Sequence, residues 1–215
     1  MSGPAPSGPT PAISAVPASP VRPGAIRRGA GEELPSCDEE VLHLCEGVVA
    51  TRALHADGDA VLLDLAGPGQ WILPHPADDC HVVHTAHTEV RVERLPWASV
   101  AGSVEAAVRL REQLRWREAW AAAQARPHTE DRLTGLLRLL GQRFGRWKQD
   151  ELLVDVELTH AQLASATGRT RPTVTRALRR LCRSGALRVE EVAGSARPRY
   201  VLLFPEVSSS HSWRH

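Results

Sequence analysis

The chain has 215 residues, which allows one or two compact domains. Hydrophobic residues make up 42% and charged residues 24%, enough to bury a core, and the formal net charge is only +1. No apolar run approaches the roughly 18–20 residues that a membrane-spanning helix needs, so the composition excludes a transmembrane protein. Four scattered cysteines exclude a disulfide scaffold and favour a reducing compartment, the cytoplasm.

Residues 1–34 are predicted to be a disordered tail. The first 31 residues contain seven prolines, five glycines and no acid. Such a segment cannot bury enough apolar area to offset the entropic cost of ordering it. A second, short tail is predicted over residues 206–215.

Residues 35–97 predict a small β-barrel. Short β-like runs at 41–44, 48–54 and 61–65 are separated by turn residues at 55–59 and 67–69, and two or three further strands follow between 71 and 94. The Asp-Gly pair at 57–58 supplies the positive φ that a tight hairpin requires. Strands spaced in this way are typical of a small barrel or sandwich.

Residues 98–127 predict one long helix, over about 99–126, with no proline inside it. Apolar side chains fall near heptad a and d positions, which indicates packing against a second copy of the helix. The predicted dimer interface consists of Val100, Ala107, Leu110, Leu114 and Ala121. The alternative is a stripe that covers the chain's own barrel.

Residues 128–205 predict a winged helix-turn-helix. Thr159 and Gln162 form a capping box for a short helix that ends at Gly168. Thr170 then caps a second helix, which stops at Gly185. Two helices joined by so short a turn are a helix-turn-helix, and the strands predicted at 187–192 and 199–204 form a wing beside it.

The second helix has an apolar face and a basic face. Val174, Ala177 and Leu181 share one side, and arginines occupy the other. Residues 158–203 contain nine arginines against two acids, a net charge of +7 that leaves −6 for the rest of the chain. A basic helix with a free N-terminus suits the major groove of double-stranded DNA, and the alternative is a solvated charged face. The predicted DNA-binding residues are Thr159, Thr170, Arg171, Thr173, Thr175, Arg176, Arg179, Arg180, Arg183, Arg197 and Arg199.

The run Thr170-Arg171-Pro172-Thr173-Val174-Thr175-Arg176, with the preceding stretch from Leu158, resembles the winged helix of the CRP/FNR (catabolite activator) transcription regulators. It is most similar to their cyanobacterial nitrogen-control subgroup. The resemblance implies an α+β fold with a shortened cyclic-nucleotide-binding-like jelly roll, a long dimerisation helix and the winged helix. It also implies a homodimer without enzymatic activity that regulates transcription from a two-fold-related DNA site, with RNA polymerase as a further partner.

Two departures limit what the resemblance carries over. The family's barrel is nearly twice as long, and its phosphate-binding arginine is replaced by the acidic neighbourhood of Asp79. Because an acid repels a phosphate, cyclic-nucleotide binding is not predicted, and the effector is left open. Pro172 stands where many members have a base-reading glutamate.

A cluster of histidines and a cysteine suggests a metal site at first sight: His75, Cys80, His81, His84 and His87. Side chains alternate along a strand, so His81 and His84 point in opposite directions, and His81 and His87 lie about 20 Å apart. No metal site is therefore predicted. The alternative functions are a β-barrel metal-binding protein or metalloenzyme using His84, His87 and Glu89, and a winged helix that binds protein. Cys182 is expected to be a buried, unreactive thiol.

Overall fold

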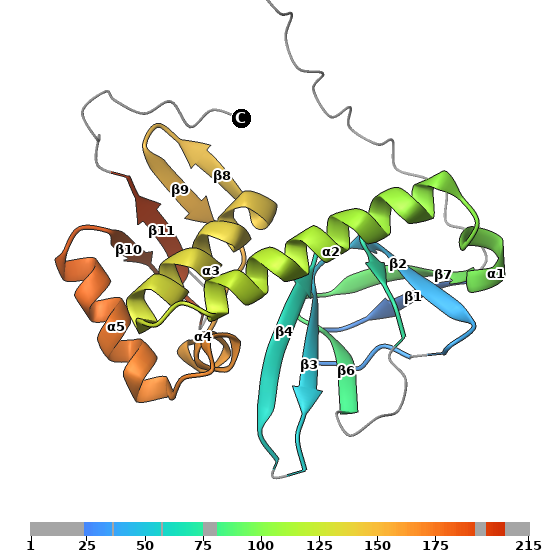
Figure 1. The fold of residues 1–215 in the computed structure, drawn as a ribbon, viewed down its shortest axis with the longest axis horizontal. Coiled ribbons are helices and arrows are strands. Elements are labelled where there is room, and N and C mark those ends of the chain that lie inside the picture. The colour runs from blue at the N-terminus through green and yellow to red at the C-terminus, as the bar shows by residue number, and fades with distance from the viewer. Residues whose placement is uncertain (1–23, 36, 57, 75–80, 192–196, 205–215) are drawn as a thin grey trace, which may run out of the picture.

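The computed structural model describes residues 24–35, 37–56, 58–74, 81–191 and 197–204. It consists of an N-terminal β domain and a C-terminal part of helices and a small sheet, and a long helix, α2, lies across both (Figure 1). The predicted mixture of α and β structure is confirmed. None of the described helices is both long and apolar enough to span a lipid bilayer.

Two antiparallel sheets form the β domain. One has the order β1-β7-β2-β5, from Ala25–Arg28, Val90–Pro96, Glu40–Glu46 and Trp71–Ile72. The other has the order β4-β3-β6, from Ala60–Ala66, Val49–Leu54 and His81–Ala86. Since alternate residues of a strand point to opposite faces, Leu42, Leu44, Val90 and Val92 enter the core while their neighbours point outwards.

The predicted tail is too long at its C-terminal end. β1 pairs with β7, with Ala25 opposite Glu93, and Glu33 forms an isolated bridge with Thr85. Leu34 is only 2% exposed. The edge of β7 supplies hydrogen-bonding partners for this segment, and composition alone contains no information on that pairing. Residues 1–23 lie outside the described part of the chain.

The long helix begins later than predicted. A short helix, α1 (Trp97–Val100), comes first, and α2 covers Val104–Gln124. Ser103 separates them, because its hydroxyl accepts a hydrogen bond from the Ala106 amide at 3.0 Å and caps α2. A turn at residues 101–103 therefore interrupts the predicted continuous helix.

In the residues that the structure describes, the C-terminal part contains three helices and a four-stranded sheet. The helices are α3 (Thr129–Phe144), α4 (His160–Thr167) and α5 (Arg171–Arg183). The sheet has the order β10-β11-β9-β8, from Leu187–Glu190, Arg199–Leu203, Glu151–Val154 and Gly145–Lys148. The predicted wing is thus the β10–β11 hairpin, whose residues 192–196 lie outside the described residues. β8 was not predicted.

One hydrophobic cluster among the described residues extends across the two parts. Leu62 and Leu65 of β4 are buried together with Trp120 of α2 and Leu136 of α3. The hydroxyl of Ser165 on α4 donates to the Ala60 carbonyl at 2.6 Å and accepts from the Leu62 amide at 2.7 Å.

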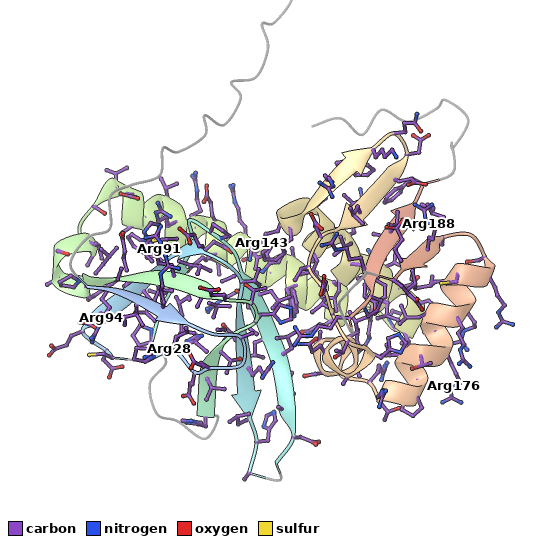
Figure 2. All side chains as sticks on the ribbon, turned by 180° about the vertical axis from the view of Figure 1, so that it is seen from behind. Arg28, Arg91, Arg94, Arg143, Arg176 and Arg188 are labelled. Carbon is purple, nitrogen blue, oxygen red and sulfur yellow. The ribbon has the colours of Figure 1, made fainter. Side chains whose placement is uncertain are left out.

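Polar contacts at the same junction centre on Asp64. Its Oδ1 accepts a hydrogen bond of 2.6 Å from the Trp116 indole and lies 3.5 Å from Nη1 of Arg143. Arg143 also donates to the Leu65 carbonyl at 2.9 Å, and its guanidinium lies 3.2 Å from the centroid of the Trp116 ring. Figure 2 shows Arg143 between the β domain and the C-terminal part. The contacts hold α2, α3 and β4 together.

Candidate nucleic-acid interface

The turn between α4 and α5 forms as the sequence predicts. The Thr159 hydroxyl accepts from the Gln162 amide at 3.1 Å, and the Gln162 side chain accepts from the Thr159 amide at 2.9 Å, which completes the capping box. Gly168 ends α4 in the left-handed conformation, at φ 61°. Thr170 is the N-cap residue of α5, but its hydroxyl contacts that of Thr173 at 2.9 Å instead of a backbone amide.

α5 has the two faces that the sequence predicts. The buried residues are Val174, Ala177, Leu178 and Leu181. The arginines of the opposite side are exposed, and within the described residues Arg171, Arg176, Arg179 and Arg183 have no acidic partner within 4.0 Å. Figure 2 shows Arg176 on the outer side of α5, away from the β domain. Three unpaired guanidiniums therefore lie along one side of α5, and that of Arg171 projects from its N-terminal end.

Two polar groups link this face to α4. The Thr175 hydroxyl donates to the Arg171 carbonyl at 3.0 Å, so it accepts a hydrogen bond from Nδ1 of His160, also at 3.0 Å. Burial lowers the pKa of His160, and the nearby charges of Arg171 and Arg179 lower it further. At neutral pH His160 is a neutral side chain that orients Thr175.

Two of the predicted contacts are engaged in ion pairs instead. Arg180 pairs with Glu130 of α3, and this hydrogen bond lowers the pKa of Glu130. Arg199 lies 3.2 Å from Asp155 and 3.7 Å from Glu157. These acids compete with a phosphate for the two guanidiniums, so we do not assign Arg180 and Arg199 a role in the interface proposed below. The sequence alone did not indicate these ion pairs, because Glu130 lies on α3 and Asp155 and Glu157 lie in the loop between β9 and α4.

The structure also corrects the prediction for Cys182. Its side chain is exposed on α5 and lies beside a surface groove that His160, Arg176, Arg179 and other residues of α5 line. The helical angle placed Cys182 at the border of the core face, where a small rotation decides between burial and exposure.

The histidine cluster does not converge within the described residues. Nε2 of His84 donates to the Leu73 carbonyl at 3.2 Å, and its Nδ1 contacts the Thr51 hydroxyl at 3.0 Å. His84, His87 and Glu89 are not among the groups of described side chains whose ligand atoms lie within 4.8 Å of one another. The proposed metalloenzyme site is therefore not formed by these three residues. His75 and Cys80 lie outside the described residues.

His87 instead connects the β domain to the C-terminal part. Its Nε2 donates to the Glu157 carbonyl at 2.9 Å, and its Nδ1 accepts from the Gln162 side chain at 3.4 Å. Burial is the main cause that lowers the pKa of His87, and Arg197 and Arg52 lower it further. The neutral form fits both contacts, because a proton on Nδ1 would oppose the Gln162 donor.

We expect stability to fall as the pH decreases through this titration. The unfolded chain binds the proton more readily than the folded chain does, so the free energy of unfolding decreases between about pH 7.5 and about pH 5.5. The Tm of the wild type should drop by a few degrees more over this range than that of His87→Gln. His55→Gln, which changes an exposed residue, should behave as the wild type does. Equal pH dependence in all three proteins would contradict the assignment.

The comparisons with known proteins identify this part of the chain. Residues 131–194 match the family model for a Crp-like helix-turn-helix domain. The chain contains a Crp-like helix-turn-helix domain. The matched residues include α4, the turn and α5, and therefore also Arg171, Arg176, Arg179 and Arg183. No curated protein sequence matches the chain.

Solved structures show that the fold is also shared. A CRP-family transcriptional regulator from Thermus thermophilus matches with a TM-score of 0.66 and 21% identity, over 83% of this chain and 92% of that one. A CRP/FNR-family regulator from the same organism matches with a TM-score of 0.64 and 23% identity, over 84% and 93%. FixK2 from Bradyrhizobium japonicum matches with a TM-score of 0.63 and 20% identity, over 83% and 91%. The predicted fold class is confirmed, and the nitrogen-control subgroup stays a prediction.

Proposed function

We propose that the chain is a sequence-specific DNA-binding transcription regulator that acts as a homodimer on a two-fold-related site. The Crp-like helix-turn-helix domain supports a DNA-binding regulator. The observation that carries the specific proposal is a set of exposed guanidiniums on α5 that have no acidic partner among the described residues, Arg171 at the N-terminal end and Arg176, Arg179 and Arg183 along one side. Guanidiniums in such a row neutralise phosphates, and those near the helix N-terminus reach base edges.

The position along α5 divides these residues into two roles. Arg171 begins the helix, where side chains reach furthest into the major groove, and its forked guanidinium suits O6 and N7 of guanine. Thr173, Thr175 and Arg176 lie on the same first turns. Arg183 is the last residue of the helix, where the groove wall passes, and we assign it to phosphate.

Arg171→Ala and Arg183→Ala test this division. We expect Arg171→Ala to cost about 1–3 kcal/mol per half-site on the preferred sequence and much less on random DNA. Arg183→Ala should weaken binding to both duplexes by a similar, smaller factor, because a phosphate contact carries no sequence information. Selection of bound duplexes from random DNA first supplies the preferred site, and four affinities at one fixed salt concentration then decide.

Two results would contradict the proposal in different ways. Equal weakening on both duplexes by Arg171→Ala would make Arg171 a phosphate contact and move base reading to Thr173, Thr175 and Arg176. Failure of the wild type to retain any duplex at low salt would favour a winged helix that binds protein.

The homodimer is proposed from the outer side of α2. The side facing the rest of the protein buries Ala106, Trp120 and Ala123. Leu114 on the other side is 58% exposed, and Ala107 and Ala121 of the predicted seam are exposed too, while Leu110 and Val100 are half-buried. α2 thus covers its own chain with a different stripe, which leaves Ala107, Leu114 and Ala121 available for a second copy. Val100 belongs to α1 and packs against the cluster of Val41, Trp71 and Ala106, so it is not part of the proposed seam. Burying exposed leucine against a second copy is favourable.

Leu114→Asp should convert the dimer into monomers. The substitution leaves the protomer intact because Leu114 already faces solvent, but it would bury an unpaired charge at the interface. Light scattering should give the mass of two chains for the wild type and of one chain for Leu114→Asp. Val189→Asp, which changes another exposed apolar residue on β10, is the control and should remain dimeric. A wild-type mass of one chain would contradict the proposal.

The domain organisation follows from these roles. We propose a sensor-like β domain, a dimerisation helix and a DNA-binding domain at the predicted places, with the β domain extended to β1 and the dimerisation helix shortened to α2. DNA as the partner places the regulator in the cytoplasm. RNA polymerase remains a partner implied by the family resemblance, and transcription in vitro from a promoter carrying the selected site tests it.

A further inference from the structure

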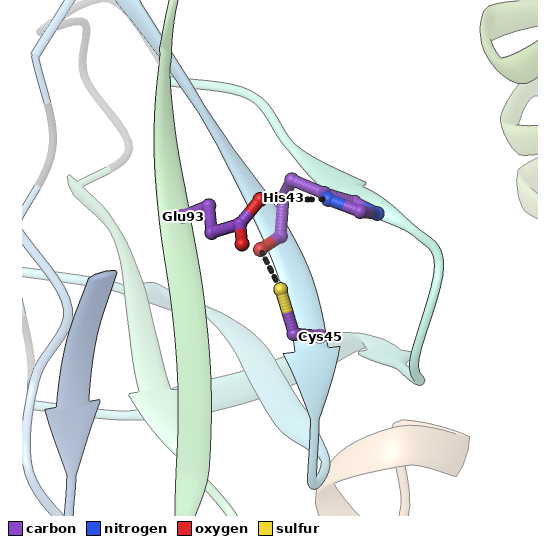
Figure 3. A group of neighbouring side chains, drawn as sticks. All are labelled: His43, Cys45 and Glu93. Carbon is purple, nitrogen blue, oxygen red and sulfur yellow. Dashed lines mark hydrogen bonds and ion pairs between the residues drawn. The ribbon is translucent and has the colours of Figure 1, made fainter. Parts of the chain in front are cut away.

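A cluster of metal-ligating side chains lies outside the DNA-binding part. His43 and Cys45 are two residues apart on β2, on the face opposite to the buried Leu42 and Leu44. Glu93 is the direct partner of His43 on β7, so its side chain reaches the same face. Figure 3 shows the imidazole, the thiol and the carboxylate gathered over these two strands.

The three side chains are close enough to share one ion. Their potential ligand atoms all lie within 4.8 Å of one another, and Nδ1 of His43 is 3.8 Å from the Glu93 carboxylate. With metal–ligand bonds of about 2.0–2.3 Å, the donor atoms of a tetrahedral site lie about 3.5 Å apart. Side-chain rotations that move each ligand atom by about 1 Å therefore close the site without moving the strands.

The donor set and its surroundings indicate which ion fits. An imidazole nitrogen, a thiolate sulfur and a carboxylate oxygen are ligands that zinc accepts, and hard ions such as Mg²⁺ avoid thiolate. Glu93 is only 9% exposed, and so is partly withdrawn from water. Burial raises the pKa of Cys45 and lowers that of His43, so the imidazole is neutral and binding must release the thiol proton.

Two arginines lie near the cluster, and each is paired with an acid outside it. Arg91 forms two ion pairs, with Glu46, to which its Nε donates at 2.9 Å, and with Glu93 at 3.7 Å. Arg109, whose charge reaches His43, pairs with Glu105 at 2.7 Å. In the sum of charges, Glu46 and Glu105 offset the two arginines, so the negative charges of Glu93 and of a Cys45 thiolate offset a divalent cation.

We propose that His43, Cys45 and Glu93 bind a divalent transition metal of the zinc type, with one coordination position open to water or an external ligand. The site lies in the β domain and does not depend on DNA binding. The histidine-rich segment that the sequence draws attention to is a different set of residues. The relevant partner, Glu93, is far from His43 along the chain, and only the strand register brings the two together.

Cobalt binding to the full-length protein tests the site. After removal of metal with a chelator, the protein is titrated with Co²⁺ alone. We expect one ion per chain, with a thiolate-to-cobalt charge-transfer band that Zn²⁺ abolishes. Cys45→Ser should lose the band, and Glu93→Gln should bind Co²⁺ at least about ten-fold more weakly. Cys37→Ser and Cys182→Ser, at exposed thiols, are the matched controls and should keep the band.

A second measurement needs no variant. In the wild type, Zn²⁺ should protect Cys45 from alkylation, measured by peptide mass spectrometry, while Cys182 reacts as before. Absence of the charge-transfer band, its persistence in Cys45→Ser, or alkylation of Cys45 at the same rate with and without Zn²⁺ would overturn the proposal. Duplex retention by the same preparation shows whether the DNA-binding proposal stands independently of this result.

Discussion

Affinity for DNA should fall by roughly 10³–10⁵ between 50 and 200 mM salt if about 6–10 phosphates are neutralised. The two copies of α5 in a dimer present Arg171, Arg176, Arg179 and Arg183 twice, and these side chains have no described acid within 4.0 Å to compete with a phosphate. Each phosphate contact releases condensed counterions from the duplex, so affinity depends on salt to a power set by the number of contacts. The measurement is a series of binding titrations on one duplex at several salt concentrations.

Two arginine variants test where these phosphates are bound. Arg183→Ala should lower the slope by nearly two in the dimer, about 0.9 for each phosphate that the variant no longer neutralises. Arg27→Ala, an exposed arginine of β1 that pairs with Glu89 at 3.4 Å, removes the same charge far from α5 and should leave the slope unchanged. A flat response of the wild type would mean that the +7 segment does not lie on DNA.

The parts of the site that could be predicted depend on local signals. A capping box, a left-handed glycine and the angles of a helix are properties of residues a few positions apart, so Thr159, Gly168 and the two faces of α5 were within reach of the sequence. The same holds for those strands of the β domain in which apolar and polar residues alternate and which end at turn residues.

The parts that could not be predicted depend on remote partners. β1 is a strand because β7 offers it an edge, and Arg180 and Arg199 form ion pairs because Glu130 and Asp155 face them. The pairing of His43 with Glu93 is likewise a matter of strand register. The break before α2 is different, since it has a local signal: Ser103 is a good N-cap residue, and the apolar spacing that predicts a continuous helix runs across it.

Asp64→Ala should lower the free energy of unfolding by about 3 kcal/mol. Asp64 is the acid that faces Arg143 at the junction of the two parts, and their side chains are only 16% and 15% exposed. Burial lowers the pKa of Arg143 to about 10 and Asp64 opposes this shift, so at neutral pH the guanidinium is charged. Removal of the carboxylate leaves that charge poorly compensated and the Trp116 indole without its acceptor, and both losses destabilise the junction.

Three variants separate charge from packing in chemical denaturation. Asp64→Asn keeps an acceptor for the Trp116 indole and should lose less stability than Asp64→Ala, with the remainder assigned to the charge of Arg143. Glu89→Ala removes an exposed ion pair with Arg27 and should leave the midpoint nearly unchanged, because solvent screens such pairs. Since Leu62 and Leu65 share their core with Trp120 and Leu136, the β domain and the C-terminal part should lose stability together in Asp64→Ala. Two separate unfolding transitions in the wild type, of which Asp64→Ala shifts only one, would contradict a shared core.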